Sequence, residues 1–285
     1  MTLKMRRQKR GSMLNPETRL FAILGFPIKH SFSPQMQNAW FEKEKLDCAY
    51  LAFETEPRNL KKTVEALKLL GFCGINITIP HKTEIMKYLD HTDKASKLIG
   101  SVNTISVNNG KLYGYNTDYS GFASDLVSKN IKVKDNTVLI FGAGGGARAI
   151  IYSIKNSDAK RVYLSNRTHK NAVKLAKEFK IEAVEADKIR GILPECGLIV
   201  NASACGMKKT DTLPFEADNF RKDAVIYDLI YNKPTPFVNA AKKHGIKFFT
   251  GEGMLINQGA HGFKIWTGIY PDTKSALTLF NKFTR

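Results

Sequence analysis

The stretch TVLIFGAGGGARAI at residues 137–150 decides the predicted fold. An apolar run up to Phe141 predicts a buried strand, and the residues after the glycines predict a helix. Gly142 permits the tight turn between them, Gly144 lets a pyrophosphate approach the backbone, and Ala147 allows the helix to pack closely on the sheet. The start of the helix would supply free N–H groups for phosphates. A glycine-rich turn in this setting predicts a dinucleotide site at Gly142, Ala143, Gly144, Gly145 and Gly146.

The end of the next predicted strand indicates which dinucleotide would bind. Proteins that bind NAD place an acidic residue there, about 20 residues further on, to bind the ribose 2′-hydroxyl. Here the stretch VYLSNRT has no carboxylate and instead brings Asn166, Arg167 and Thr168. A guanidinium suits a 2′-phosphate through charge-assisted hydrogen bonds or stacking, so the pattern favours NADP(H). The alternative, from these residues alone, is an arginine in a solvated loop.

Strands and helices alternate on both sides of this motif. Before it, strands are predicted at 18–25, 48–55 and 74–79, helices at 34–46 and 58–71, and a hairpin turn at Asn109–Gly110. After it, the stretches RVYLSNR, IEAVEA, GLIVNAS, AVIYDLIY and IKFFTG continue the alternation. The tail from residue 252 is predicted to be helical and to pack on the first domain, because its apolar face needs a partner surface.

This order of elements predicts an α/β protein of two domains. We expect an N-terminal α/β domain with a mostly parallel sheet over residues 17–118 and 252–285, and a Rossmann-type, doubly wound NADP-binding domain over 119–251. The length of 285 residues fits two domains better than one. Residues 1–16 are basic and are expected to form a flexible arm.

Composition argues against several classes of protein. No apolar run approaches the ~20 residues of a membrane-spanning helix, and the N-terminus lacks the apolar core of a secretory signal. The cysteines form no C-x-x-C pair and the six histidines no H-x-x-x-H pair. These spacings argue against a metal site and a disulfide framework, and they predict a cytoplasmic protein.

The chain is strongly basic, with a formal net charge of +18. One interpretation is nucleic-acid binding. A second is a solvated lysine-rich surface, as in KNAVKLAKEFK at 170–180, and a third is a positive field that attracts small anionic substrates. No basic cluster outside the N-terminal arm is interleaved with aromatic residues. We therefore favour the last two and expect neither nucleic acid nor a membrane as a partner.

A second motif, GINITIPHK at residues 74–82, ends a predicted strand by presenting a lysine. The isoleucines at 75, 77 and 79 alternate with polar residues and are expected to anchor the strand in the core. The proline then stops the strand, so that Lys82 follows at its carboxyl end, where open α/β sheets bind ligands. Taken alone, the motif is more typical of a solvated turn lysine.

Nine sequence blocks stand in a fixed order from about residue 18 onward and cover both predicted domains. They are GFPIKHSFSP (25–34), NITIPHK (76–82), GSVNTI (100–105), GYNTDYSG (114–121), GAGGGARA (142–149), NRT (166–168), NASACGM (201–207), YDLIYNKPTPF (227–237) and GEGMLINQGAHGFKIWTG (251–268). In this order they resemble the shikimate dehydrogenase family. The resemblance implies a substrate domain built from both chain ends. It also implies reversible, NADPH-dependent reduction of 3-dehydroshikimate to shikimate, a step toward chorismate and the aromatic amino acids.

The resemblance also implies roles for individual positions. Lys82 and Asp118 would form an acid–base pair in which the ammonium protonates the reduced ketone and the carboxylate orients the ammonium. Ser31 and Ser33 would bind the substrate carboxylate, and their hydroxyls face the same way if that segment is extended. The other substrate-binding positions would be Thr78, Asn103, Asp118, Tyr231 and Gln258, and those near the nicotinamide would be Leu229, Gly251 and Met254.

The chain departs from the family's pattern at three places. Ser203 and Ala204 in NASACGM replace a threonine and a serine, which removes one hydroxyl near the nicotinamide unless Ser203 compensates. Gly146 stands where alanine is common, and Gln37 stands where histidine is frequent.

Two related functions stay open alongside an NADP-dependent shikimate dehydrogenase. A quinate/shikimate dehydrogenase would have a broader substrate range or use NAD, and Arg167 and the serine pair argue against it. A catalytically silent paralogue that binds nucleotide is disfavoured by Lys82 and Asp118. The expected partner is a small-molecule substrate, and the expected assembly is a monomer or a homodimer.

Overall fold

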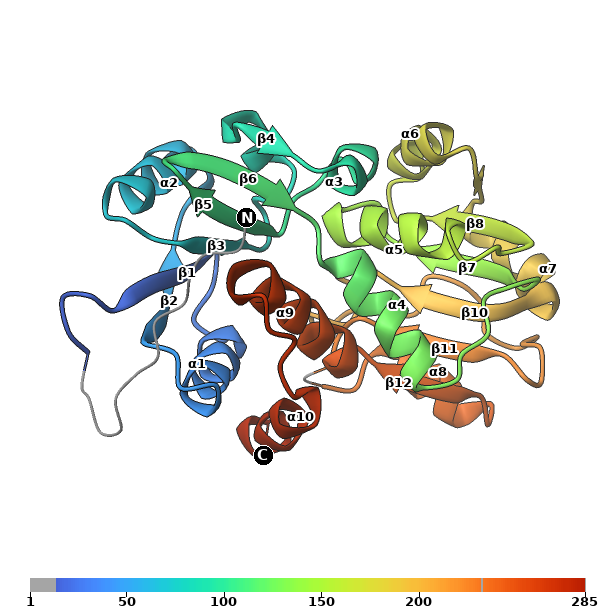
Figure 1. The fold of residues 1–285 in the computed structure, drawn as a ribbon. Helices are drawn as coiled ribbons and strands as arrows, with labels where there is room; N and C mark the ends of the chain where they lie inside the picture. Colours follow the sequence, from blue (N-terminus) through green and yellow to red (C-terminus); the bar gives the residue numbers. More distant parts are fainter. Residues whose placement is uncertain (1–13, 232, 285) are drawn as a thin grey trace. The chain divides into compact units, whose positions relative to one another are not determined.

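The structure is a computed structural model, and it describes residues 14–231 and 233–284. Its contacts divide the chain into two compact units, one running up to Gly121 and resuming at Ile256, the other spanning Phe122–Leu255 (Figure 1). We call them unit 1 and unit 2. Both borders lie a few residues beyond the predicted ones, within helices α4 (Asp118–Ser128) and α9 (Glu252–Thr267). Residues 1–13 of the predicted basic arm lie outside the described residues.

Unit 1 is built on a six-stranded sheet in the order β2-β1-β3-β5-β6-β4. Three of its five strand pairs are parallel. The hairpin between β5 and β6 forms at the predicted Asn109–Gly110 turn, where both residues have positive φ. Since β5 is antiparallel to both β3 and β6, the latter two run in the same direction. The strands are β1 (Arg19–Gly25), β2 (Cys48–Glu54), β3 (Gly74–Ile77), β4 (His91–Thr92), β5 (Thr104–Asn108) and β6 (Lys111–Tyr115).

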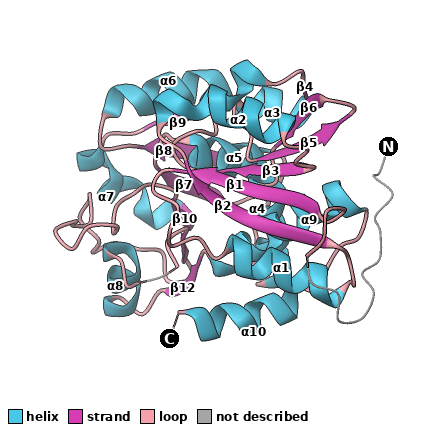
Figure 2. Cartoon of the chain, turned by 90° about the vertical axis from the view of Figure 1, so that its left-hand side faces the viewer, coloured by secondary structure: helices cyan, strands magenta, loops and turns pink. Residues whose placement is uncertain are grey.

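Helices cover both faces of this sheet (Figures 1 and 2). On one face lie α1 (Ser33–Lys43), the second part of α9 and α10 (Thr273–Phe283). There the ring of Phe21 packs against the rings of Phe41 and Trp266, with a distance of 5.1 Å between ring centroids in each pair. On the other face, α2 (Leu60–Leu69) buries its apolar side against Ile75 and Ile77. The short α3 (Lys94–Ile99) contacts β6.

One expectation for GINITIPHK is wrong. Strand β3 ends at Ile77, and the side chain of Ile79 is 67% exposed instead of anchored in the core. The reason is a tight turn in which the His81 N–H donates to the carbonyl of Thr78 (2.9 Å). The turn takes the chain out of the sheet and leaves Ile79 at a solvent-facing corner.

Unit 2 contains a second sheet, whose six strands are all parallel in the order β12-β11-β10-β7-β8-β9. If β7 is taken as the first strand of the unit and the strands are numbered along the chain, this is the strand order of a doubly wound dinucleotide-binding domain. The predicted α/β fold class is therefore confirmed. The strands are β7 (Thr137–Phe141), β8 (Arg161–Ser165), β9 (Glu182–Ala183), β10 (Cys196–Asn201), β11 (Val225–Asp228) and β12 (Lys247–Thr250).

Two apolar layers hold the helices of unit 2 on the two faces of this sheet. One layer joins β7 and β10 to α5 (Gly145–Lys155) and α6 (His169–Phe179), and the other joins them to α7 (Ile189–Ile192) and α8 (Pro236–Lys243). Among residues 14–231 and 233–284, no helix combines the length and apolar character needed to cross a bilayer.

Candidate active site

Three loops bring the predicted catalytic residues to one edge of the unit 1 sheet. Lys82 follows β3 and Asp118 follows β6, and these two strands run in the same direction. Asn103 immediately precedes β5, which runs the opposite way, so it reaches the same edge. The side chains therefore meet although 36 residues separate Lys82 from Asp118.

Lys82 and Asp118 form an ion pair. The ammonium Nζ lies 2.6 Å from Oδ2 of Asp118, and the two side chains are 17% and 5% exposed. The other carboxylate oxygen, Oδ1, accepts a hydrogen bond from Nδ2 of Asn103 at 2.8 Å. Both oxygens thus have a donor, while the ammonium keeps a solvent-accessible side from which it can donate to a substrate.

The orientation of the Asn103 amide is set by the main chain. Its Oδ1 accepts from the backbone N–H of Thr117 at 2.7 Å. Because a backbone N–H only donates, the amide oxygen must face Thr117 and Nδ2 must face the site. Nδ2 then donates to Asp118 and, at 3.2 Å, to Oε1 of Gln258. Three predicted site residues are therefore joined directly.

A buried polar chain supports Asn103 from behind. Asn76 in β3 donates from Nδ2 to the Asn103 carbonyl and to Oγ1 of Thr104, both at 3.1 Å. Its Oδ1 accepts from the hydroxyl of Tyr50 at 2.6 Å. Sequence reasoning missed these residues, and the available signal was a polar side chain in the middle of the apolar strand GINI.

Asn116 frees Asp118 for its contacts with Lys82 and Asn103. Asn116 Oδ1 accepts from the backbone N–H of Asp118 at 3.0 Å, and its Nδ2 donates to the carbonyl and hydroxyl of Ser101. Asparagine commonly closes turns in this way. Asn116, and not Asp118, therefore closes this turn.

The segment Ser31–Ser33 is not extended, so strand geometry does not align its two hydroxyls. Ser33 is the first residue of α1, and Phe32 before it has helical dihedral angles, with φ −76° and ψ −15°. Ser31 Oγ accepts from the N–H of Ser33 at 3.3 Å, so Ser31 lies just before the helix and its hydroxyl is held at the helix start. A helix start favours a bound carboxylate. Thr78 directly follows β3, and its N–H donates to the carbonyl of Leu24 at 2.9 Å.

The glycine turn of unit 2 fits a dinucleotide. Gly142 has φ +114°, and a Cβ there would lie 2.5 Å from the carbonyl oxygen of Ala202, so no other residue fits without a shift. A Cβ on Gly144 would meet nothing within 4 Å, which leaves open space at the start of α5. Ala147 is buried against the sheet. The tight turn at Gly142 and the open space at Gly144 are the backbone features on which the predicted dinucleotide site depends.

The predicted 2′-phosphate residues follow β8. Asn166 Nδ2 donates to the carbonyl of Thr168 at 3.0 Å, and Thr168 directly precedes α6. Arg167 between them is exposed. An extended guanidinium at this strand end can therefore reach a phosphate.

The remaining predicted positions in unit 2 are partly explained by packing. A Cβ on Gly251 would lie 2.2 Å from the carbonyl oxygen of Leu229, so these two segments touch through their backbones. Met254 is buried in the apolar layer under α5. Burial raises the pKa of Tyr231. The hydroxyl of Ser203, for which compensation of a lost hydroxyl near the nicotinamide was left open, donates to Oδ1 of Asn201 at 2.6 Å.

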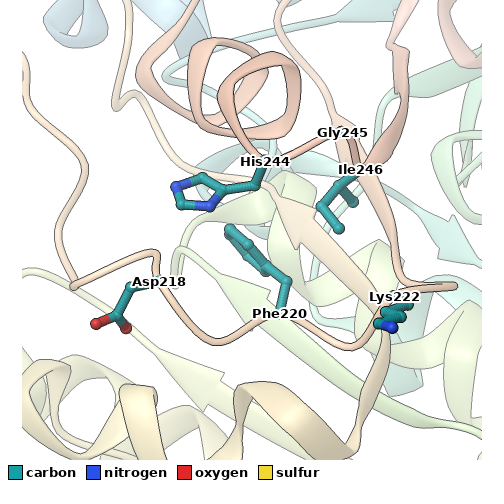
Figure 3. A pocket seen from close by; sticks show the side chains of 6 residues that line it. All are labelled: Asp218, Phe220, Lys222, His244, Gly245 and Ile246. Atoms are coloured by element: carbon teal, nitrogen blue, oxygen red, sulfur yellow. The ribbon is translucent and has the colours of Figure 1, made fainter.

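A surface hollow of about 340 Å³ in unit 2 lies apart from all predicted site residues (Figure 3). The rings of Phe220 and His244 meet there edge to face, with centroids 5.6 Å apart. None of the dinucleotide positions contributes to it, and we give it no role in the site. It is lined by Asp218, Phe220, Lys222, His244, Gly245 and Ile246.

Three segments of the chain match known protein families. Residues 23–105 match the shikimate dehydrogenase substrate binding domain, residues 125–211 match shikimate/quinate 5-dehydrogenase, and residues 251–277 match the shikimate 5′-dehydrogenase C-terminal domain. A curated relative, shikimate dehydrogenase (NADP(+)) of Aquifex aeolicus, is 44% identical over 256 residues, which cover 90% of this chain and 94% of the relative.

Solved structures are similar over the same extent. A crystal structure of shikimate dehydrogenase from Aquifex aeolicus has a TM-score of 0.88 at 42% identity and covers 93% of this chain and 98% of its own. A structure of shikimate 5-dehydrogenase from Thermus thermophilus in complex with NADP(H) and shikimate has a TM-score of 0.85 at 34% identity, covering 93% and 99%.

Proposed function

The chain belongs to the shikimate dehydrogenase family, and we propose that it catalyses the reversible reduction of 3-dehydroshikimate to shikimate with NADPH, a step toward chorismate and the aromatic amino acids. The observation that carries this proposal is the Lys82–Asp118 ion pair at the carboxyl edge of β3. A silent relative would have no need to keep a lysine paired and partly accessible at this position.

We assign the chain's residues as follows. Bound NADPH supplies the hydride. Reduction of the ketone places negative charge on its oxygen, which the Lys82 ammonium stabilises and protonates, and Asp118 keeps that ammonium in place. Thr78, Asn103 and Asp118 hold ring hydroxyls, and Gln258 also reaches the substrate. Ser31 and Ser33 bind the carboxylate at the start of α1. The glycine turn and Arg167 hold the cofactor. The positions assigned to the nicotinamide end are Leu229, Gly251 and Met254. Tyr231 is assigned to the substrate.

Oxidation of shikimate and of quinate, each measured with NADP⁺ and with NAD⁺, tests the function. We expect the largest kcat/KM for shikimate with NADP⁺. A larger kcat/KM for quinate would instead favour the quinate/shikimate dehydrogenase alternative. Binding of NADP⁺ without turnover of either substrate would overturn the proposal.

Cofactor choice is expected to depend on Arg167. Replacing it by alanine removes the charge-assisted hydrogen bonds to a 2′-phosphate, so KM for NADPH should rise about 10- to 100-fold while KM for NADH changes little. Lys170→Ala, which removes another exposed cation at the start of α6, is the control and should leave both values unchanged. Equal changes for the two cofactors in Arg167→Ala would show that the guanidinium does not read the phosphate.

We further propose that the protein is cytoplasmic and acts as a monomer or a homodimer on a small-molecule substrate. Support for a reducing compartment comes from the cysteines, which are all free in the described chain. Sedimentation at two protein concentrations distinguishes the two assemblies.

A further inference from the structure

Unit 2 buries a carboxylate that has no cationic partner among the described residues. Asp228 is the last residue of β11 and is 0% exposed. Its Oδ1 accepts from Nδ2 of Asn201 and from the N–H of Ile230, both at 2.9 Å, and its Oδ2 accepts from the hydroxyl of Thr235. Burial raises the pKa of this carboxyl, and the hydrogen bonds act in the opposite direction. Burying a carboxylate costs free energy, which the three donors offset. The presence of a carboxylate at this buried position therefore needs an explanation.

The first of these donors organises the loop after β10. Asn201 uses Nδ2 to hold both Asp228 and, at 3.0 Å, the carbonyl of Cys205. Its Oδ1 accepts from the N–H of Ser203 at 3.1 Å and from the Ser203 hydroxyl. The same hydroxyl accepts from the N–H of Cys205 at 3.1 Å. The loop is thus folded around Asn201, and Asp228 fixes the orientation of the Asn201 amide.

The other donors organise the segment after β11. Thr235 caps the start of α8, where its Oγ1 accepts from the N–H of Val238 at 3.2 Å while its hydroxyl donates to Asp228. A Cβ on Gly206 would lie 2.7 Å from Cβ of Thr235, so the two loops also pack on each other. One carboxylate therefore ties together the loops at the carboxyl ends of two neighbouring strands.

These loops touch the dinucleotide turn. The carbonyl of Ala202 lies against Gly142, and the side chain of Leu229 lies 3.8 Å from the position that a Cβ on Gly146 would take. The carbonyl of Leu229 meets Gly251. Asp228 is thus hydrogen-bonded to the segments that follow β10 and β11, and both segments lie against the dinucleotide turn.

We propose that Asp228, through Asn201 and Thr235, is a positioning residue for the cofactor, holding the loops after β10 and β11 in the arrangement that binds NADP(H). Naming the cofactor rests on the proposed function. The buried carboxylate is kept because it accepts donors from both loops at once, which an apolar residue could not do.

Titration of NADPH by its fluorescence tests this proposal, in Asp228→Asn and in Thr235→Val. Each variant should raise the NADPH dissociation constant about 10-fold, because loops that must be ordered on binding lower affinity. KM for shikimate should stay within about 2-fold, and Thr235→Ser, which keeps the hydroxyl, should bind like the wild type. Thr137→Val is the control, because this threonine is also buried in unit 2 but lies at the start of β7, away from the loops.

Trypsin cleavage after the exposed Lys208 and Lys209 gives a readout that needs no ligand, and it should be faster in Asp228→Asn and Thr235→Val than in Thr137→Val. Unchanged NADPH affinity in Thr235→Val, with only a lower melting temperature, would overturn the proposal even if Asp228→Asn failed to fold. Wild-type protein that binds NADPH but does not oxidise shikimate would refute the proposed function and leave this inference standing. Wild-type protein that does not bind NADPH would refute both.

Discussion

Lys82→Ala is expected to lower kcat for shikimate oxidation by about 10²- to 10⁴-fold, the usual contribution of a positioned general acid or base. The ammonium lies 2.6 Å from Asp118 and follows a tight turn at the end of β3. It is therefore held in one place before substrate arrives, and no other described cation is paired with Asp118. KM for shikimate should change much less than kcat, because other side chains are assigned to the ring hydroxyls and the carboxylate.

The matched control for this substitution is Lys87→Ala. Lys87 lies five positions along the chain, is 68% exposed and pairs with Glu84 at 2.9 Å on the surface. Surface pairs of this kind contribute little to stability, so kcat and melting temperature should both stay close to wild type. If Lys82→Ala kept a near-wild-type kcat at several pH values, Lys82 would not be the acid–base residue.

The sequence was sufficient for the positions of most strands and for the doubly wound class of unit 2, but not for the strand order of unit 1. Strong periodicity and turn residues located most strands within a residue or two. The glycine turn identified the doubly wound unit. It misplaced Ile79, because strand alternation was extended into a turn whose geometry depends on the His81–Thr78 hydrogen bond. It left the conformation of Ser31 and Ser33 open, since proline after serine is compatible with a helix start as well as with an extended segment.

Side-chain networks were the part that could not be predicted. The Asn109–Gly110 turn predicted the β5–β6 hairpin, but no local pattern shows that β5 pairs with β3, which makes β6 run in the direction of β3 and brings Asp118 to Lys82. Asn76 in the middle of β3 and Asp228 at the end of β11 are single polar residues in apolar strands, and most of their partners come from other parts of the chain. Their importance is visible only when the donors around them are identified.

The pairing between Lys82 and Asp118 can be separated from its contribution to folding by Asp118→Asn. The new amide can accept from Asn103 with its oxygen, but its nitrogen then faces the Lys82 ammonium, so donor meets donor. We expect kcat to fall about 10²-fold because the ammonium is no longer oriented. The free energy of unfolding should fall by about 1–3 kcal/mol, less than for a fully buried pair, because Lys82 can turn toward water.

Unit 2 supplies a closely matched control in the pair Lys129–Asp125. Its Nζ–Oδ2 distance is 2.7 Å and its side chains are 17% and 3% exposed, against 2.6 Å, 17% and 5% for Lys82–Asp118. Asp125→Asn should therefore destabilise the protein by a similar amount, measured by urea unfolding, without a comparable loss of kcat. Lys82→Met combined with Asp118→Asn removes both charges and should recover stability but no activity. A double variant that recovered activity together with stability would mean that the ion pair serves folding alone.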